Sequence, residues 1–320
     1  MHQFSIITPS YNRAAYLPRI YDSLCQQKDI DFEWVIIHDG STDNTRGVVS
    51  EFPKIFEIKY AYQNNAGKPS AMNLGTQMAN SYISVSFDSD DILCRDVLKT
   101  VWSYFDINTG KFEHDCVCIS GLCKYENGDI IGKIFPYDYY ISDHIRYRHN
   151  KGLRGDKLEF VLTSVLKNYP FPIFNNEKNI APGILMIRMA LSHKTLYINH
   201  VFAEKQFLPG GLSTQNYWFV YTLGSELYYN EASIPPYKLL LQIMHSGKYI
   251  YFAKFNGKKN IYLNALNKHI FPLGIFYYFI FIIKLFLKKF IIMQKINDLI
   301  KIIFIKIFSR PNNYKVFKNG

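Results

Sequence analysis

The stretch Ser84-Val85-Ser86-Phe87-Asp88-Ser89-Asp90-Asp91 decides the fold of this 320-residue chain. Its first half consists of small, β-branched and aromatic residues, which is typical of a buried strand. Three carboxylates follow, and such crowding is unfavourable unless a cation or the start of a helix offsets the charge. We expect Asp91 to cap a helix that begins at Ile92–Leu93. Asp88 and Asp90 point to the same side of an extended chain, where two carboxylates suit Mg²⁺ or Mn²⁺.

Three further strands are predicted upstream of this stretch, at Phe4–Thr8, Glu33–His38 and Glu57–Tyr62. Helical patterns separate the strands, over Ala15–Gln27 and Pro69–Met78. Strands that alternate with helices form a parallel sheet with helices on both faces, so we predict a doubly wound α/β domain. In such a sheet, ligands bind beyond the carboxyl ends of the strands.

Each predicted strand ends in a polar loop. These loops are Pro9–Arg13, Asp39–Thr45, Asn64–Lys68 and Asp88–Asp91. Asp39 is suited to accept hydrogen bonds from a base or a ribose, and Lys68 is suited to offset phosphate charge. Asp43 is expected to cap the helix that follows it rather than to contact a ligand. The Asp-Ser-Asp motif alone fits an acidic turn in water equally well, and the chain contains neither a dinucleotide-binding glycine motif nor a P-loop.

In their order and spacing, these loops resemble the family 2 glycosyltransferases, which are inverting enzymes with a GT-A fold. The segments that carry the resemblance are Thr8–Arg13, Asp39–Asp43, Asn65–Lys68 and Asp88–Asp91. The resemblance implies a nucleotide-diphosphate sugar as donor, with UDP as the commonest nucleotide of the family. It implies that Asp88 and Asp90 form an Asp-x-Asp pair, with Asp90 on Mn²⁺ or Mg²⁺. The residues implied to contact the donor are Thr8, Pro9, Tyr11, Arg13, Asp39, Lys68, Asp88, Ser89 and Asp90.

The middle of the chain marks a change from a parallel to a mixed sheet. Apolar runs at Cys116–Lys124 and Ile130–Phe135 flank Asn127-Gly128, a pair that is typical of a hairpin turn. We therefore predict a nucleotide-binding half over residues 1–110 and an acceptor-binding half over residues 111–247.

An inverting transfer needs a carboxylate that takes the proton of the acceptor hydroxyl. Segments of the middle third resemble a bacterial subgroup of the family that builds exopolysaccharide and cell-surface glycans. Glu177 is the first candidate for the base, with a helix N-terminal acid as the alternative, and Asp156 is the second, with a solvated loop acid as the alternative. The subgroup carries a further Glu where this chain has Gly183. The Gln-x-x-Arg-Trp motif of the processive synthases does not occur, which favours addition of one sugar per encounter.

Residues 248–320 form a basic, apolar tail. This segment holds 14 Lys and Arg residues and one acid, Asp298, so the positive charge of the chain lies in an apolar tail rather than on a folded nucleic-acid-binding surface. Ile270–Ile283 is uncharged but shorter than the roughly 20 residues of a spanning helix. Several basic residues share one helical face, namely Lys284, Lys288, Lys295, Lys306 and Arg310. We expect the tail to lie in a membrane interface, with a helix packed on the catalytic domain as the alternative.

The sequence as a whole predicts a metal-dependent, non-processive glycosyltransferase with a glycan or lipid-linked acceptor. Its expected place is cytoplasmic, peripheral on the inner face of a bacterial plasma membrane, and a homodimer is left open. A nucleotidyltransferase of sugar phosphates is an alternative, although such enzymes usually carry a glycine-rich basic loop in place of Pro9–Arg13. A non-catalytic protein that binds sugar nucleotides or glycans is the second alternative.

Overall fold

The structure is a computed structural model that describes residues 1–105, 115–206 and 220–288. The chain divides into two compact units, Met1–Tyr228 and Tyr229–Gly320, and each is described by itself. Of the predicted interfacial tail, residues 289–320 lie outside the described residues. The nucleotide-binding half predicted at 1–110 and the acceptor-binding half predicted at 111–247 share one sheet, because strands from both belong to it.

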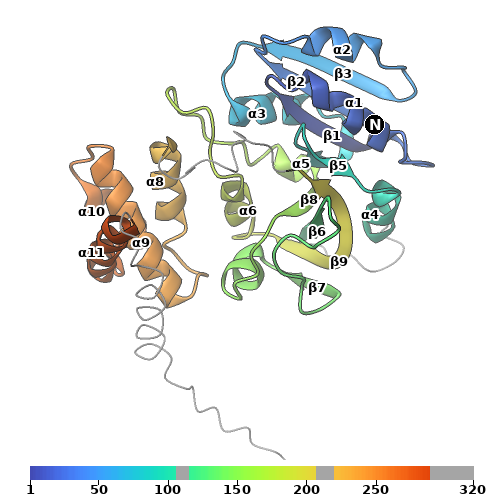
Figure 1. Cartoon of the computed structure of the whole chain (residues 1–320). Coiled ribbons are helices and arrows are strands. Elements are labelled where there is room, and N and C mark those ends of the chain that lie inside the picture. Colours follow the sequence, from blue (N-terminus) through green and yellow to red (C-terminus); the bar gives the residue numbers. More distant parts are fainter. Residues whose placement is uncertain (106–114, 207–219, 289–320) are drawn as a thin grey trace, which may run out of the picture. The chain divides into compact units, whose positions relative to one another are not determined.

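The first unit is built on a mixed sheet of nine strands (Figure 1). The strands are β1 (His2–Ser10), β2 (Phe32–Asp39), β3 (Glu57–Gln63), β4 (Ser81–Ser86), β5 (Ile92–Leu93), β6 (Cys116–Tyr125), β7 (Tyr139–Ser142), β8 (Lys157–Leu162) and β9 (Lys194–Lys205). Their order is β3-β2-β1-β4-β8-β6-β9-β5, with β7 paired to β9. The first four strands in this order run parallel and β8 runs antiparallel to β4, so the predicted doubly wound mixed sheet is confirmed.

Alternation along the strands separates two apolar layers. Phe4 and Ile6 of β1 pack with Leu17 and Ile20 of α1 (Leu17–Leu24) in one buried cluster. Ile7, the next residue along β1, packs on the opposite face with residues of α3 (Lys68–Met78). Because side chains of a strand alternate between the two faces, helices cover both sides of the sheet.

The remaining helices of this unit are short. They are η1 (Ala14–Tyr16), α2 (Thr45–Glu51), α4 (Val97–Phe105), the π-helix η3 (Ile145–His149), α5 (Thr163–Leu166) and α6 (Gly183–Met189). A longer helix, α8 (Thr222–Glu231), begins near the end of the unit. The predicted helix over Ala15–Gln27 is correct in place but shorter, since it begins as a 3-10 turn and ends at Leu24.

The register brings the carboxyl ends of the parallel strands to one edge. Ser10 at the end of β1 lies opposite His38 of β2, and Asp39 at the end of β2 lies opposite Gln63 of β3. The backbone nitrogen of Phe87 donates to the carbonyl of Ile7 at 2.9 Å, which carries the β1–β4 pairing up to the acidic turn. The loops that follow these strands therefore share one edge of the sheet.

Two local predictions were wrong or only partly right. The helix expected at Ile92–Leu93 is instead the short strand β5, which pairs with β9, and α4 begins at Val97. The predicted hairpin turn forms, with Gly128 at φ 90°, but its second arm is reduced to an isolated bridge between Lys124 and Ile130. The chain leaves the hairpin after that bridge because β8 and β9 already pair with both edges of β6.

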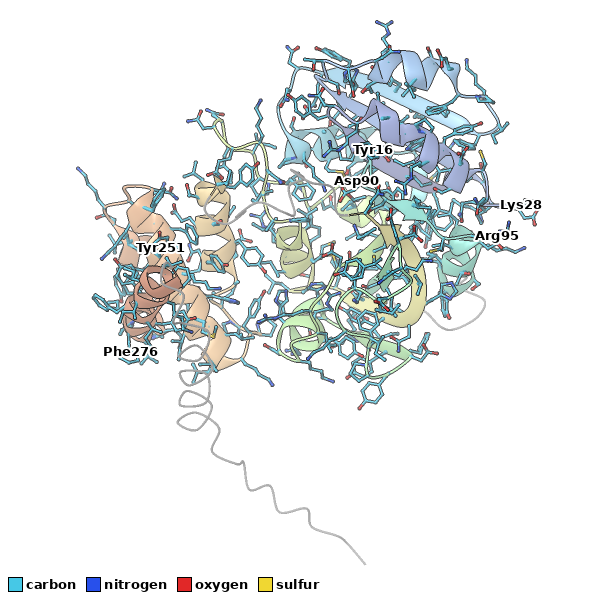
Figure 2. All side chains as sticks on the ribbon, viewed as in Figure 1. Tyr16, Lys28, Asp90, Arg95, Tyr251 and Phe276 are labelled. Atoms are coloured by element: carbon cyan, nitrogen blue, oxygen red, sulfur yellow. The ribbon has the colours of Figure 1, made fainter. Side chains whose placement is uncertain are left out.

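The second unit contains a pair of closely packed helices, α9 (Leu239–Phe255) and α11 (Phe271–Lys288), with the short α10 (Ile261–Asn264) between them in sequence. Gly247 on α9 permits the approach, since a Cβ there would lie 2.8 Å from the carbonyl oxygen of Gly274 on α11. Tyr251 of α9 meets Phe281 of α11 edge to face at 5.3 Å, and Figure 2 labels Tyr251 together with Phe276 of α11. Gly247 lies in the middle of α9, so the division predicted between residues 247 and 248 falls inside a helix. Across the described residues, we find no helix with the length and apolar character needed to cross a bilayer.

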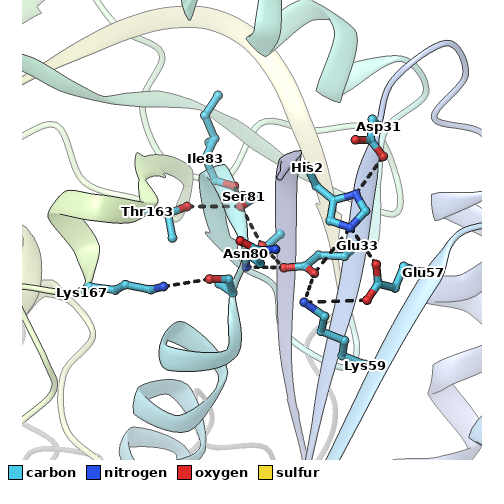
Figure 3. Close-up of polar contacts among 12 residues, drawn as sticks. His2, Asp31, Glu33, Glu57, Lys59, Asn80, Ser81, Ile83, Thr163 and Lys167 are labelled. Carbon is cyan, nitrogen blue, oxygen red and sulfur yellow. Dashed lines mark hydrogen bonds and ion pairs between the residues drawn. The ribbon is translucent and has the colours of Figure 1, made fainter.

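The opposite edge of the first sheet carries a cluster of charges (Figure 3). Glu33 is fully buried, and its carboxylate accepts hydrogen bonds from Ser5 Oγ and the Asn80 backbone, at 2.5 and 2.6 Å, while Lys59 Nζ lies 2.5 Å away. His2 lies 2.8 Å from Asp31 through Nδ1 and 2.8 Å from a second carboxylate, that of Glu57, through Nε2. These contacts tie β1, β2 and β3 together at their amino ends, away from the polar loops.

Candidate active site

Asp39 holds the loop that leads into α3. It is buried at the end of β2, and Oδ1 accepts hydrogen bonds from the side chain of Gln63 at 2.7 Å and the backbone of Ala66 at 2.9 Å. Its second oxygen accepts from the backbone of Gly67 at 2.9 Å. With one donor on Oδ2 among the described residues, this oxygen has a lone pair left, so a contact with a ligand is compatible with this role.

The segment around Glu177 lies against the start of α3. The backbone nitrogen of Lys68 donates to the carbonyl of Lys178 at 3.0 Å. Gly67 has φ 92°, and a Cβ on it would lie 2.3 Å from that same carbonyl oxygen. The loop predicted to serve the donor phosphate and the segment predicted to serve the acceptor are therefore in direct backbone contact.

The acidic turn after β4 is largely neutralised by two lysines. Lys68 Nζ forms an ion pair with Asp88 Oδ1, and Lys205 Nζ lies 2.6 Å from Asp91 Oδ2 and 4.0 Å from Asp88 Oδ2. Burial opposes ionisation of Asp88, but the charges of Lys68 and then Lys205 outweigh it and lower the pKa of Asp88 to about 2. Asp88 is therefore a carboxylate at neutral pH. The predicted capping role of Asp91 is wrong, because its carboxylate pairs with a lysine from β9.

Asp90, labelled in Figure 2, is the acid of this turn without an ion pair among the described residues. Its side chain is half-buried. Burial, followed by repulsion from Asp88, raises the pKa of Asp90, while the more distant charges of Arg13 and Lys68 act in the opposite direction. A cation held between Asp88 and Asp90 would relieve this repulsion, and hard carboxylate oxygens are the ligands that Mg²⁺ and Mn²⁺ prefer. The residues present therefore fit a divalent metal ion.

Lys205 is a site residue that sequence reasoning missed. It is 14% exposed, and although burial alone would lower its pKa, the charges of Asp91 and Asp88 outweigh burial and raise it. It is separated from Asp91 by 114 positions, so no local pattern connects the two residues. The only available signal was a lysine at the end of a largely apolar strand.

The loop after β1 is held by side chains of the next loop. Asn12, at φ 52°, accepts a hydrogen bond from the backbone of Thr42 at 2.8 Å. Asp43 accepts from the backbone of Ala14 at 2.9 Å and from the backbone of Thr45, the first residue of α2, at 3.2 Å. The predicted structural role of Asp43 is confirmed, and it extends to fixing the β1 loop.

The other residues predicted to contact the donor differ in accessibility. Thr8 is fully buried, and its hydroxyl accepts a hydrogen bond from the indole of Trp34 at 2.9 Å, so its side chain belongs to the core. Ser89 is also buried, whereas Tyr11 is 47% exposed. Pro9 and Arg13 are half-buried. The open surface of this edge is therefore provided mainly by Tyr11, Arg13, Lys68 and Asp90.

Glu177 caps a helix, although not the one that the sequence suggests. Its Oε1 accepts a hydrogen bond from the backbone of Leu223 at 2.6 Å, and Oε2 accepts one from the backbone of Gly224 at 2.8 Å. Both donors belong to the first turn of α8, where a carboxylate interacts favourably with the free backbone N–H groups. The nearest helix along the chain, α6, begins only at Gly183. Asp156, the second candidate base, is exposed in the loop before β8.

Comparison with known proteins finds a family model and relatives that are similar to part of this chain. The model of Glycosyl transferase family 2 matches residues 5–156. Chondroitin synthase of Pasteurella multocida is 36% identical over 96 residues, which cover 30% of this chain and 10% of the relative. The structure of S. aureus TarS 1-349 in complex with UDP-GlcNAc is similar with a TM-score of 0.60 at 19% identity, over 86% of this chain and 79% of that chain. A mannosyltransferase from Pyrobaculum calidifontis, in complex with GDP-Man and Mn2+, gives a TM-score of 0.50 at 15% identity, over 96% of this chain and 81% of that chain.

The curated matches cover only part of longer proteins. The chain spans 20%, 23% and 29% of the lengths of three uncharacterised glycosyltransferases, two from Rickettsia and one from Nostoc, to which it is 29%, 31% and 37% identical. The similarity to solved structures shows the fold, whose mixed sheet and loop edge agree with the GT-A arrangement. The family match covers the four polar loops and the strands that carry them. Residues 5–156 of the chain therefore match glycosyl transferase family 2, and the fold of the sheet agrees with the GT-A arrangement.

Proposed function

We propose that the protein is an inverting glycosyltransferase that moves a sugar from a nucleotide-diphosphate sugar to a hydroxyl group of a surface-glycan intermediate. The observation that carries the proposal is the junction of Lys68, Asp88 and Asp90 at the carboxyl edge of the sheet. There a cationic side chain and an uncompensated carboxylate lie together, which suits a pyrophosphate and a divalent cation.

The donor is proposed to be a UDP-sugar bound over the β1 and β2 loops. Support comes from S. aureus TarS, which shares the fold and is described in complex with UDP-GlcNAc. Asp39 lies at the end of β2, where the remaining lone pair of its Oδ2 suits a hydroxyl group of a ribose. Tyr11 offers an exposed ring at the neighbouring loop.

The metal is proposed to be Mn²⁺ or Mg²⁺, held by Asp90 and Asp88. The Pyrobaculum calidifontis mannosyltransferase, which has a similar fold, is described with Mn2+. When bound, the ion stabilises the negative charge that develops on the departing diphosphate. Lys68 contributes a second positive charge at the same edge, and Arg13 lies close enough to influence Asp90. The metal ion and Lys68 would thereby favour the departure of a nucleoside diphosphate.

The acceptor hydroxyl requires a base, and Glu177 is the first candidate. Its segment touches the start of α3, which brings it to the donor side of the site. Oε1 of Glu177 accepts hydrogen bonds from the Leu223 backbone and the Thr222 hydroxyl. Among the described residues, Oε2 accepts only from the Gly224 backbone, which leaves it a lone pair for a further hydrogen bond. Asp156 is the second candidate and has an exposed position. Glycan or lipid-linked acceptors, one sugar per encounter and a place on the inner face of the membrane complete the proposal.

The test combines binding with turnover. The double variant Asp88→Asn/Asp90→Asn is compared with Asp22→Asn, an exposed acid on α1, as the control. We expect the double variant to lose Mn²⁺ binding, measured by electron paramagnetic resonance, and metal-dependent release of UDP from a panel of UDP-sugars. The control should retain both. Unchanged metal binding and sugar-nucleotide affinity in the folded double variant would overturn the proposal.

A further inference from the structure

The exposed face of α11 is apolar over its described length. Leu273, Phe276, Phe279 and Ile283 are 50%, 63%, 57% and 51% exposed. They recur every three or four residues, so they form one stripe along the helix. The opposite face carries Gly274 and the buried Tyr277, against which α9 packs. A contiguous exposed apolar stripe of this kind is typical of a surface that binds a partner or a membrane.

Apolar exposure continues beyond α11 within the same unit. In α10, Tyr262 and Leu263 are 50% and 64% exposed, and Leu266 just after it is 56% exposed. The ring of Tyr262 meets that of Phe271, the first residue of α11, edge to face at 5.2 Å. The contact joins α10 to the start of α11. We call this joint surface, with the stripe above, the α10–α11 face.

Lysines accompany the α10–α11 face, and acids are nearly absent from its unit. Residues 229–288 contain eight lysines and one acid, Glu231. Lys258 and Lys259 precede α10, Lys268 lies between α10 and α11, and all three are exposed. Such clustered positive charge attracts the anionic headgroups of a bilayer.

A second copy of the chain is a poorer occupant of this face than a bilayer. Two copies meeting through it would bring two sets of lysines together with few acids to offset them, and like charges disfavour association. An anionic bilayer meets both features at once, because the acyl region takes Phe and Leu side chains while headgroups pair with lysines. Tyr262 also suits the boundary between these regions, since its ring is apolar and its hydroxyl is polar.

We infer that the α10–α11 face is a membrane-binding surface that lies in the interface of an anionic bilayer. Phe276, Phe279 and Leu263 enter the outer acyl region, and Lys258, Lys259 and Lys268 contact lipid phosphates. This assignment places the contact on described helices of the second unit, whereas the sequence pattern pointed to a lysine-bearing face that extends to residue 310. It is independent of the transfer chemistry.

The experiment measures binding of the full chain to vesicles. Vesicles of phosphatidylcholine with 30% phosphatidylglycerol, about the charge of an anionic leaflet, are compared with pure phosphatidylcholine in a sedimentation assay. We expect wild type to bind the anionic vesicles at least about tenfold more tightly. Phe276→Ser/Phe279→Ser should lose about tenfold or more in affinity. The matched control, Ile134→Ser/Ile173→Ser, removes two side chains of the first unit that are 60% and 52% exposed and should bind as wild type.

A second variant tests the charges. Lys258→Gln/Lys259→Gln/Lys268→Gln should retain weak binding but lose most of the preference for anionic vesicles and most of the salt dependence. Circular dichroism and metal-dependent release of UDP are expected to stay unchanged in all variants, which separates this inference from the proposed function. The inference is overturned if wild type ignores anionic vesicles or if the Phe276 and Phe279 variant binds them normally. The inference is also overturned if wild type forms a dimer in the absence of lipid and the Phe276 and Phe279 variant is monomeric.

Discussion

Glu177 Oε2 accepts a hydrogen bond from the backbone nitrogen of Gly224 at 2.8 Å, so the carboxylate proposed as the catalytic base also caps α8. The two roles predict different consequences for the same substitution. A capping carboxylate contributes to the free energy of unfolding, whereas a base contributes to kcat.

For Glu177→Gln, we expect both effects. The amide retains one acceptor for the helix, so the free energy of unfolding should fall by only about 1 kcal/mol. Loss of the basic group should lower kcat by about 10²- to 10⁴-fold, with UDP affinity unchanged. Calorimetry for UDP, a transfer assay and urea unfolding measure the three quantities. If kcat stays near the wild-type value while stability falls, Glu177 is a cap alone and Asp156 becomes the first candidate.

Lys205→Met should be strongly destabilising. The substitution leaves the buried Asp91 carboxylate without its partner at 2.6 Å and removes one of the two cations near Asp88. Breaking a buried pair in this way costs about 3–5 kcal/mol, measured by urea unfolding. The control is Lys194→Met, which removes an exposed pair with Asp115 at 3.1 Å and should cost about 0–1 kcal/mol. Equal effects of the two substitutions would contradict the buried ion pair, and Lys205→Arg should recover part of the loss.

Gly67→Ala should cost far more than Gly128→Ala. Both glycines have φ near 90°, a conformation that other residues rarely adopt, so both substitutions carry backbone strain. A Cβ at Gly67 would lie 2.3 Å from the Lys178 carbonyl oxygen, whereas nothing lies within 4 Å of one at Gly128. We expect about 1–2 kcal/mol for Gly128→Ala and more than about 3 kcal/mol for Gly67→Ala. Because Lys68 follows directly, Gly67→Ala should also weaken UDP binding, and similar losses at the two positions would contradict the contact.

The charge cluster at the amino end of the sheet predicts a pH dependence of stability. A hydrogen bond with Asp31 raises the pKa of His2, burial opposes it, and Glu57 raises the pKa further. Protonated His2 therefore stabilises the folded state fully below about pH 6.5, its unfolded pKa, and this contribution is lost as pH rises through the folded pKa.

The corresponding measurement is urea unfolding at about pH 6 and about pH 8.5, on either side of the titration of histidine. Wild type should lose more stability over this interval than His2→Gln. His200→Gln removes an exposed histidine of β9 and should behave as wild type. If His2→Gln keeps the full wild-type dependence, the pH response arises elsewhere.

The parts of the fold that sequence predicted are those encoded locally. The four parallel strands were found within one to three residues of their observed ends, because each is an apolar run followed by a polar loop. Asp91 was assigned to the wrong partner because an aspartate before an apolar run is compatible both with a helix cap and with a buried ion pair. The sequence does not show that Lys205 lies beside it. The division predicted between residues 247 and 248 falls inside α9, because a change in charge composition does not mark the end of a packed unit. Glu177 was placed in the right region, but its contact with Gly224 depends on tertiary packing.

The separation of Asp91 and Lys205 bears on how the protein is made. During translation the acidic turn leaves the ribosome 114 residues before the lysine that neutralises it. At roughly 5–20 residues per second, the interval lasts roughly 6 to 23 s. Throughout that time the nascent β1–β4 segment carries a carboxylate that is stable only in water, so the burial of this turn must wait for the last strand of the sheet.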